Sequence, residues 1–361
     1  MSNMEPDLSP IRPEIRAMRA YHVADATGLI KLDAMENPYR LPEPLAHELG
    51  ERLAAVALNR YPPADPAALK TKLARAIGLP HGAALMLGNG SDELIHLAIQ
   101  ACARPGVTVL APWPGFVMYE LSTLFNGCRF VGVPLKPDFS LDVPAMRAAI
   151  ELHKPAIVFI AHPNNPTGNL FGRDAIRAVI DVAPGLVVLD EAYLPFAQDT
   201  WLPALAAHPN LLVLRTLSKL GLAGLRLGYL CAHPAWIAEF DKVRPPYNVN
   251  VLTLAAVDLL LDHLDALDGQ AARIRAERTR VLAALRNIPG VTAFDSAANF
   301  LLHRVGDADG VFARLKQRGI LVKNVARMHP LLAGCLRTTI GTAEENDAFL
   351  AALITSLEED R

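Results

Sequence analysis

The chain has 361 residues, of which 52% are hydrophobic and 20% are charged, and its formal net charge at pH 7 is −2. This length exceeds the size at which one hydrophobic core usually stops growing, so we expect a large domain and a smaller one. The basic residues form no block of the kind that binds a phosphate backbone, which excludes a nucleic-acid partner.

The sequence also gives no support for a membrane or a metal partner. Residues 1–13 are polar and lack the apolar core of a secretory signal, and the apolar stretch 251–261 is interrupted by Asp258. The four cysteines lie far apart, and the eleven histidines show no metal-binding spacing. We therefore expect a soluble, cytoplasmic protein with reduced thiols, no metal and no membrane partner.

The region before residue 246 alternates between short apolar runs and helix-like segments. Helical spacing of apolar residues occurs at 91–103 and 173–182. The alternation predicts an α/β fold with a mainly parallel sheet that helices cover on both faces. The expected strands are residues 83–87, 107–111, 130–133, 156–161, 186–189, 211–214 and 227–230.

The pattern changes after the two prolines at 245–246. A long helical region is expected over 251–287, and short strands over 300–303 and 336–340. This change predicts a large domain over residues 46–246 and a small α+β domain over 247–361. Residues 1–45 are rich in proline and should form an arm that packs on the small domain.

Polar residues follow several of the predicted strands. A glycine turn at 88–90 opens a helix at Ser91, Asn165 lies in a turn, and Asp190 and Tyr193 follow another strand. Lys219 comes just after the apolar run 211–214. Taken alone, each has an ordinary reading as a helix cap, a turn or a solvated lysine. Because parallel strands end at one edge of a sheet, the set predicts a ligand site there.

Together these residues resemble pyridoxal-phosphate transaminases of the fold-type I family, over nearly the whole chain. The segments that carry this resemblance are 164–168 (NNPTG), 190–193 (DEAY), 215–219 (RTLSK), 224–226 (GLR) and 336–337 (LR). Within that family the chain most resembles the histidinol-phosphate aminotransferases. The segments that carry the narrower resemblance are 32–39 (LDAMENPY), 60–62 (RYP), 88–93 (GNGSDE), 246–250 (PYNVN) and 341–346 (GTAEEN).

The resemblance implies a role for each polar residue around pyridoxal 5′-phosphate. Lys219 would bind the cofactor through its amine and act as general acid and base on the substrate proton. Asp190 would keep the pyridine nitrogen protonated, and Asn165 and Tyr193 would hydrogen-bond the phenolic oxygen. A ring would stack on the cofactor, with Phe116 preferred and Trp113 as its rival. The phosphate would be held by Gly90, Ser91, Asp92, Thr216, Ser218 and Arg226.

The resemblance also implies substrate contacts and a homodimer. Arg337 would receive a substrate carboxylate, such as that of glutamate. Tyr21 would lie near the substrate phosphate, and Tyr61 would reach the cofactor phosphate of a neighbouring subunit. Lys323 stands where many histidinol-phosphate enzymes place an arginine for the substrate phosphate, and Arg327 lies nearby. A lysine offers a point charge where an arginine offers a bidentate fork.

Two further departures concern the cofactor side. His162 replaces the asparagine that usually begins the turn at 162–168, and the loop from Lys219 to Arg226 is one residue shorter than in many relatives. The leading hypothesis is transamination of histidinol phosphate with 2-oxoglutarate, giving imidazole-acetol phosphate and glutamate. The alternatives are an aromatic amino-acid aminotransferase, a decarboxylase of an amino-acid phosphate such as threonine phosphate, and a non-enzymatic regulator that binds the cofactor.

Overall fold

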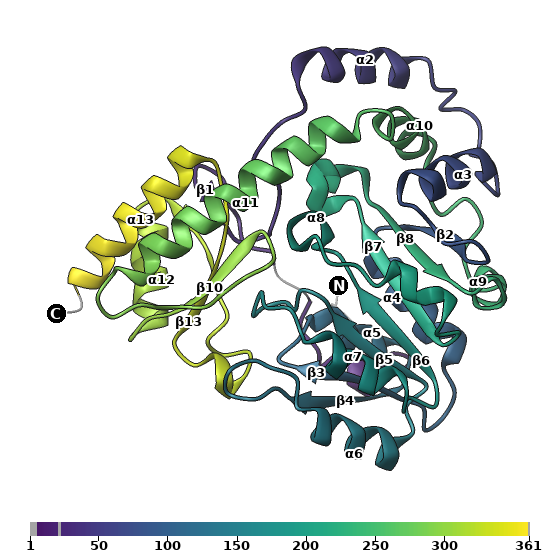
Figure 1. Cartoon of the computed structure of the whole chain (residues 1–361), viewed down its shortest axis with the longest axis horizontal. Helices are drawn as coiled ribbons and strands as arrows, with labels where there is room; N and C mark the ends of the chain where they lie inside the picture. Colours follow the sequence, from purple (N-terminus) through teal and green to yellow (C-terminus); the bar gives the residue numbers. More distant parts are fainter. Residues whose placement is uncertain (1–5, 21–22, 360–361) are drawn as a thin grey trace, which may run out of the picture.

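The computed structural model describes residues 6–20 and 23–359 and arranges them around two main sheets, with the long helix α11 between them (Figure 1). The larger sheet has seven strands in the order β2-β8-β7-β6-β5-β3-β4. We call this sheet and the helices packed on it the larger unit. Its strands are β2 (Ala84–Asn89), β3 (Thr108–Trp113), β4 (Arg129–Pro134), β5 (Ile157–Ala161), β6 (Leu186–Asp190), β7 (Leu211–Thr216) and β8 (Leu227–Ala232).

Alternate strand residues of this sheet point to opposite faces, and each face has its own core. On β5, Val158 and Ile160 belong to one buried cluster, whereas Ile157 and Phe159 belong to the other. Burial on both faces explains why the central strands are continuous apolar runs. The Phe159 face is covered by α4 (Ser91–Cys102), α5 (Val117–Phe125) and α9 (Pro234–Asp241), and the Val158 face by α6 (Val143–His153) and α7 (Arg173–Ile180).

The strand directions bring one end of most strands to a common edge. Strands β3 to β7 pair in parallel, whereas β8 is antiparallel to both of its neighbours, β7 and β2. The expectation of an α/β fold with a mainly parallel sheet is therefore confirmed. The carboxyl ends of β5, β6, β7 and β2 and the amino end of β8 lie at the same edge.

The smaller unit is built on an antiparallel sheet of four strands in the order β12-β13-β10-β9. The buried apolar faces of β10 and β13 pack under α11, α12 and α13. Its elements are α11 (Leu264–Arg286), β9 (Thr292–Ala293), β10 (Phe300–Arg304), α12 (Ala308–Gln317), β11 (Ile320–Leu321), β12 (Lys323–Asn324), the 3₁₀ turn η4 (Pro330–Leu332), β13 (Cys335–Thr339) and α13 (Ala343–Glu358).

The helical region expected over residues 251–287 is divided in two. It forms two helices, α10 (Val251–Leu260) and α11, because His263 has a non-helical backbone with φ −124° and ψ 31°. Helix α10 packs on α2 (Glu43–Ala54) and α3 (Ala67–Ala76).

The N-terminal arm contacts both units. It carries α1 (Pro13–Ala17) and β1 (Ile30–Lys31), and β1 pairs in parallel with β11 of the smaller unit. The guanidinium of Arg12 donates to the carbonyl of Phe125, at the end of α5 in the larger unit. The domain boundaries at residues 45 and 246 stay a prediction.

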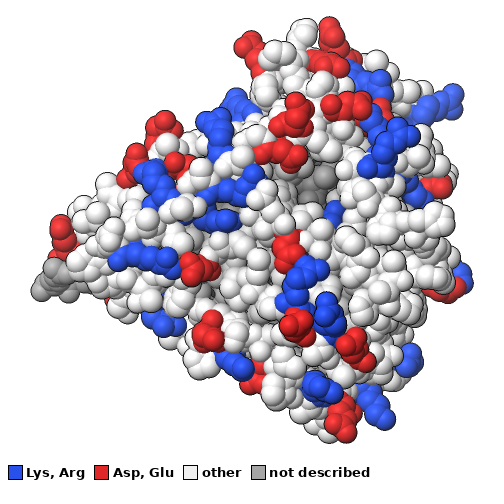
Figure 2. All heavy atoms as spheres, in the orientation of Figure 1, with Lys and Arg blue, Asp and Glu red and all other residues white. Residues whose placement is uncertain are grey.

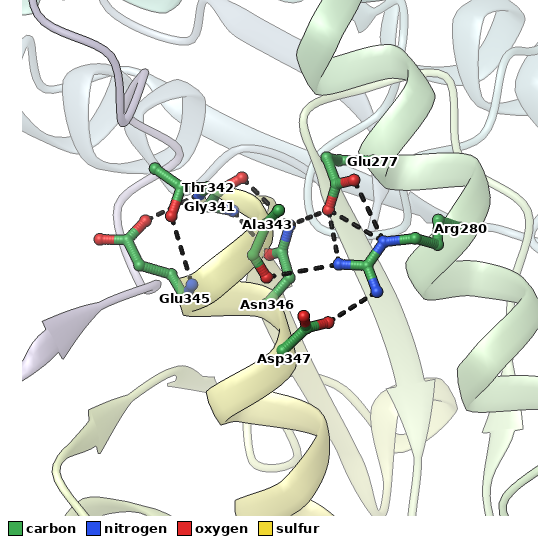
Figure 3. A network of polar contacts seen from close by, with 8 residues as sticks. All are labelled: Glu277, Arg280, Gly341, Thr342, Ala343, Glu345, Asn346 and Asp347. Carbon is green, nitrogen blue, oxygen red and sulfur yellow. Dashed lines mark hydrogen bonds and ion pairs between the residues drawn. The ribbon is translucent and has the colours of Figure 1, made fainter.

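A polar network joins β13 and α13 to α11 (Figure 3). Asn346 is buried, and its side chain accepts from the Gly341 N–H at 2.9 Å and donates to the carboxylate of Glu277 on α11 at 2.9 Å. Arg280, also on α11, pairs with Asp347 at 2.6 Å. The end of β13 and the start of α13 are therefore held to α11 through buried and charged contacts.

Charged residues of both signs are interspersed over the face of the molecule drawn in Figure 2. None of the helices in residues 6–20 and 23–359 is long and apolar enough to span a bilayer. Within the same residues, no cluster of three or more His, Cys, Asp or Glu is arranged to bind a metal ion.

Candidate active site

The shared sheet edge opens into one cavity whose walls come from several strand ends. From the larger sheet, Asn165 follows β5, Asp190 ends β6 and Thr216 ends β7. The side chains that line this cavity are Met35, Ser91, Asp92, Phe116, Ala161, Asn165, Asp190, Ala192, Tyr193, Thr216, Ser218, Lys219 and Arg226. The topology thus gathers most of the residues that the sequence predicted.

One end of the cavity is an anion site. Arg226 donates to the hydroxyl of Ser218 at 3.4 Å and lies 3.6 Å from the carboxylate of Asp92. Helix α4 begins at Ser91, and its free N–H groups and dipole favour negative charge there. Gly90 has a φ of +85°, and a Cβ at that position would meet the Arg226 guanidinium at 2.5 Å. The positive φ favours glycine, and any larger residue would also force the guanidinium to shift.

Two hydroxyl groups complete this end. The Thr216 hydroxyl donates to the Ser218 hydroxyl oxygen at 2.9 Å and accepts from the Ser218 N–H at 3.1 Å. Between them and Arg226 the chain passes through two short turns, η2 (Ser218–Leu222) and η3 (Ala223–Leu225). Gly221, with a φ of 125°, allows the sharp change of direction inside this loop. The shortened loop therefore still brings Arg226 back to Ser218.

The lining of the same cavity also includes a buried carboxylate. Asp190 accepts a hydrogen bond from the hydroxyl of Tyr119 at 2.7 Å and one from the Ala192 N–H at 3.0 Å. Burial raises the pKa of Asp190 to about 6, although both hydrogen bonds favour the charged form. This part of the cavity wall is therefore suited to a cationic or hydrogen-bond-donating group of a ligand.

A chain of hydrogen bonds links the smaller unit to the cavity wall. Arg337 on β13 donates to the Asn165 side-chain oxygen at 2.6 Å and to the Asp33 carbonyl at 2.8 Å. The Asn165 amide donates in turn to the Tyr193 hydroxyl oxygen at 3.2 Å. Burial raises the pKa of Tyr193, so its hydroxyl stays protonated and can donate into the cavity. Arg337 is thus hydrogen-bonded to the cavity wall through Asn165.

Lys219 projects into the cavity from the turn after β7. Its amine donates to the carbonyl of Ala34 in the arm at 3.3 Å and lies 6.0 Å from the centre of the Tyr193 ring. Burial, together with the positive charge of Arg337, lowers the pKa of Lys219 to about 8. Such an amine is neutral in roughly a tenth of the molecules at pH 7, far more than an ordinary lysine, so it can act as a nucleophile or a base.

The turn at 162–168 keeps its place despite the His162 departure. The His162 N–H donates to the Asp190 carbonyl at 2.9 Å, and its buried ring contacts the Asp199 carboxylate at 3.1 Å. Burial lowers the pKa of His162. The imidazole therefore pairs with Asp199, and the backbone continues to hold Asn165 at the cavity.

Several predicted residues lie outside the cavity. Trp113 packs edge-on against Phe130, whereas Phe116 lines the cavity. The Tyr61 side chain is 82% exposed. Arg327 is 84% exposed and pairs with Asp309. Tyr21 lies outside the described residues.

Lys323 has a different position from Arg327. It pairs with Arg337 in the register of β12 and β13 and is partly buried. Residues directly opposite each other on antiparallel strands place their side chains on the same face of the sheet. Lys323 therefore shares the sheet face of Arg337, which reaches the cavity wall.

Six residues with contacts at the cavity were not predicted from the sequence. Tyr119 bonds to Asp190, Ala161 and Ala192 line the cavity, and the other three are the arm residues Asp33, Ala34 and Met35. Met35 lies inside the segment LDAMENPY, which carried the resemblance without a role being given to any one residue. The contacts of Asp33 and Ala34 go through backbone carbonyls, which no side-chain pattern reveals.

The fold and the cavity define a class of protein, namely an α/β enzyme with a lysine, a carboxylate and an anion site at the carboxyl edge of a mainly parallel sheet. The chain belongs to the aminotransferase class I and II family, which matches residues 27–353. It is 59% identical to histidinol-phosphate aminotransferase 1 of Ralstonia nicotianae, over 97% of this chain and 95% of that protein. It is 60% identical to histidinol-phosphate aminotransferase 1 of Burkholderia lata, over 96% of this chain and 98% of that protein.

A solved structure agrees with these similarities. The histidinol-phosphate aminotransferase from Sinorhizobium meliloti, in complex with pyridoxal-5′-phosphate, superposes with a TM-score of 0.87 and 26% identity. The match covers 98% of this chain and 99% of that chain. The similarity extends over both units of the structure.

Proposed function

We propose that the chain is a pyridoxal-phosphate-dependent transaminase of histidine biosynthesis. It converts histidinol phosphate and 2-oxoglutarate into imidazole-acetol phosphate and glutamate. The single observation that carries the proposal is one cavity that joins Lys219, the Asp190 carboxylate and the Arg226 anion site. Near-full-length identity of 59–60% to histidinol-phosphate aminotransferases supports this choice of substrate.

The residues present fit the cofactor at its phosphate end. Arg226, the Ser218 and Thr216 hydroxyls and the start of α4 converge on a space that a Cβ at Gly90 would obstruct. An arginine fork and free helix N–H groups are the donors that phosphate oxygens prefer. Asp92, beside Arg226, orients the guanidinium and offsets part of its charge.

The residues also fit the ring of the cofactor. Asp190 lines the same cavity as the anion site, and its carboxylate would pair with a protonated pyridine nitrogen. Tyr193 accepts from Asn165, so its own proton is free to bond to the phenolic oxygen of the ring. Phe116 supplies an aromatic face in the cavity lining.

Lys219 carries the proton transfers. When bound, pyridoxal phosphate supplies an electron sink for the bond that breaks at the substrate Cα. The Lys219 amine, with its pKa lowered to about 8, accepts the Cα proton in neutral form and returns it as an ammonium group. Arg337 and Arg226 both favour the neutral amine, so two arginines that hold ligands also prepare the base.

The substrate contacts come from the smaller unit. Arg337 offers its fork to the carboxylate of glutamate or 2-oxoglutarate, in exchange for its present bonds to Asn165 and Asp33. We assign the phosphate of histidinol phosphate to Lys323, because Lys323 shares the sheet face of Arg337. Arg327 is already paired with Asp309 and is largely exposed. These positions favour Lys323 over Arg327.

A homodimer is the proposed working unit. Tyr61 stacks on Tyr247 with 4.8 Å between ring centroids, although the two side chains are 82% and 42% exposed. An ordered aromatic pair on the surface is typical of an interface, and Tyr61 would reach the partner's cofactor phosphate. Sedimentation equilibrium measures the mass, and a monomer would contradict this proposal.

We further place the enzyme in the cytoplasm. All four cysteines are free, as expected for a protein that works in a reducing compartment. Fractionation of cells that express the natural protein, with an antibody readout, tests the location, and recovery outside the cytoplasm would contradict it.

The test of function is a single-turnover absorption experiment on the cofactor-loaded protein. Separate samples are mixed with histidinol phosphate, phenylalanine and threonine phosphate. We expect histidinol phosphate to cause the spectral change of amino transfer at far lower concentration than phenylalanine. A response to phenylalanine alone would make the protein an aromatic transaminase, and release of CO₂ from threonine phosphate without glutamate formation would make it a decarboxylase.

A further inference from the structure

Tyr119 is a buried tyrosine that contacts two residues of the cavity wall. It lies on α5 and is 1% exposed. Its hydroxyl donates to Asp190 at 2.7 Å, and its ring meets the Phe116 ring edge-on, with centroids 5.5 Å apart at 88°. The Tyr119 ring also stacks on Phe159 of β5, with ring centroids 4.6 Å apart and an interplanar angle of 9°.

The start of α5 fixes the spacing between Tyr119 and Phe116. Phe116 is the residue just before the helix, and the Tyr119 N–H donates to the Phe116 carbonyl at 3.1 Å. One helical turn thus carries both the ring that faces the cavity and the hydroxyl that reaches Asp190. Because Phe159 belongs to β5, the Tyr119 ring is also anchored to the sheet that carries Asp190 on β6.

The charges around Asp190 explain what the hydroxyl contributes. Asp92 at the start of α4 and the adjacent Glu191 both disfavour a negative charge on Asp190, as burial does. The hydrogen bonds from Tyr119 and from the Ala192 N–H oppose these effects. Burial and the charge of Asp190 raise the pKa of Tyr119 well above its ordinary value, so the hydroxyl remains a donor throughout the range in which Asp190 titrates.

We propose that Tyr119 is a positioning residue for the cofactor, whose hydroxyl keeps Asp190 ionised and aimed into the cavity while its ring supports Phe116. This inference rests on the proposed function for its meaning to catalysis. The ionisation of Asp190 can nevertheless be measured without any cofactor. Phenylalanine keeps the ring of Tyr119 and therefore its packing contacts. Tyr119→Phe thus removes only the hydroxyl and isolates its effect on Asp190.

The primary test is Tyr119→Phe, with Tyr229→Phe as the matched control. Tyr229 is another buried tyrosine of the larger sheet, and its hydroxyl bonds to Arg215. Infrared spectra of the cofactor-free full chain follow the band of the protonated carboxylic acid with pH, and Asp190→Asn identifies the Asp190 contribution. We expect Tyr119→Phe to move the Asp190 midpoint upward by about one pH unit and Tyr229→Phe to leave it in place.

A second variant changes the same bond in the opposite sense. Incorporation of 3-fluorotyrosine at position 119 makes the hydroxyl a stronger donor and keeps the ring, so the Asp190 midpoint should move downward. An unchanged midpoint in both variants would overturn the inference. An equal shift in Tyr229→Phe would also overturn it, because a general loosening of the core would then explain the result.

The loaded enzyme gives an independent readout. Equilibrium dialysis of Tyr119→Phe should show cofactor dissociation constants higher by roughly tenfold, as expected for losing one hydrogen bond to a charged group. The decline of kcat toward acid should begin at higher pH, so the loss of activity is larger at pH 6 than at pH 9. If the midpoint moves but the wild-type chain binds no pyridoxal phosphate, the proposed function fails while the coupling of Tyr119 to Asp190 stands.

Discussion

The two sides of the cavity are constructed in different ways. On the side of the larger sheet, Asn165, Asp190 and Thr216 are at most 7% exposed and sit at the ends of three neighbouring strands. On the side of the smaller unit, Lys323 comes from a two-residue strand, and Arg327 is exposed. The first side is held by the register of the larger sheet and by buried bonds. The second side combines the buried Arg337 of β13 with side chains from short or exposed segments. We therefore expect the proposed chemistry to depend on the fold of the larger sheet, and substrate choice to depend more on side chains that can change at little cost to it.

The largest effect should come from the side of the larger sheet. Lys219→Ala removes the amine that we propose accepts the substrate proton, so kcat should fall by roughly 10⁴-fold or more. The anion site around Arg226 is untouched, and the variant should still bind pyridoxal phosphate without the absorption of the covalently attached form. Steady-state kinetics and absorption spectra measure both effects.

The matched control is Lys242→Ala, which removes an exposed lysine paired with Glu239. Its kcat should equal that of the wild-type protein. Retained turnover in Lys219→Ala would show that another group moves the proton. The proposal that the larger-sheet side carries the chemistry would then be wrong.

An intermediate effect should come from Arg337, which joins the two sides through Asn165. Arg337→Gln should lower kcat/KM for glutamate by about 10²-fold, because a charged fork to a carboxylate is lost. Histidinol phosphate has no carboxylate, so its half-reaction should lose less. Arg337→Lys keeps the charge but lacks the fork, so its kcat/KM for glutamate should lie between those of the wild-type protein and Arg337→Gln. Equal losses in both half-reactions would argue against a carboxylate role.

The smallest effect should come from the side of the smaller unit. Lys323→Ala should raise KM for histidinol phosphate by about tenfold while leaving that for an unphosphorylated analogue such as histidinol unchanged. Arg327→Ala breaks an exposed ion pair and should change either value by less than about twofold. If Arg327→Ala raised KM for histidinol phosphate and Lys323→Ala did not, the substrate phosphate would be assigned to Arg327 instead.

The same contrast explains what the sequence could predict. Asp190 and Lys219 each follow a continuous apolar run, and the parallel topology implied by those runs was enough to bring them to one edge. Phe116 and Tyr119 are spaced three residues apart at a helix start, yet nothing in that spacing says that Tyr119 points at β6. Two other contacts depend on the path of the arm between the units. Lys219 donates to the Ala34 carbonyl, and Arg337 donates to the Asp33 carbonyl. Such contacts arise from tertiary placement, which local patterns do not encode.

Helix α11 is hydrogen-bonded to the arm, to the larger unit and to the segment after β13. Its Gln270 bonds to the Arg40 carbonyl and to Asn37 in the arm, and its Arg275 donates to the Pro195 carbonyl of the larger unit. Glu277 of the same helix holds the Asn346 network at the end of β13 (Figure 3). A tilt of this rod would displace the arm carbonyl that faces Lys219 and the strand that carries Arg337 in a single movement. The proposed base Lys219 and the proposed carboxylate receptor Arg337 therefore both contact arm carbonyls close to the segment that α11 holds.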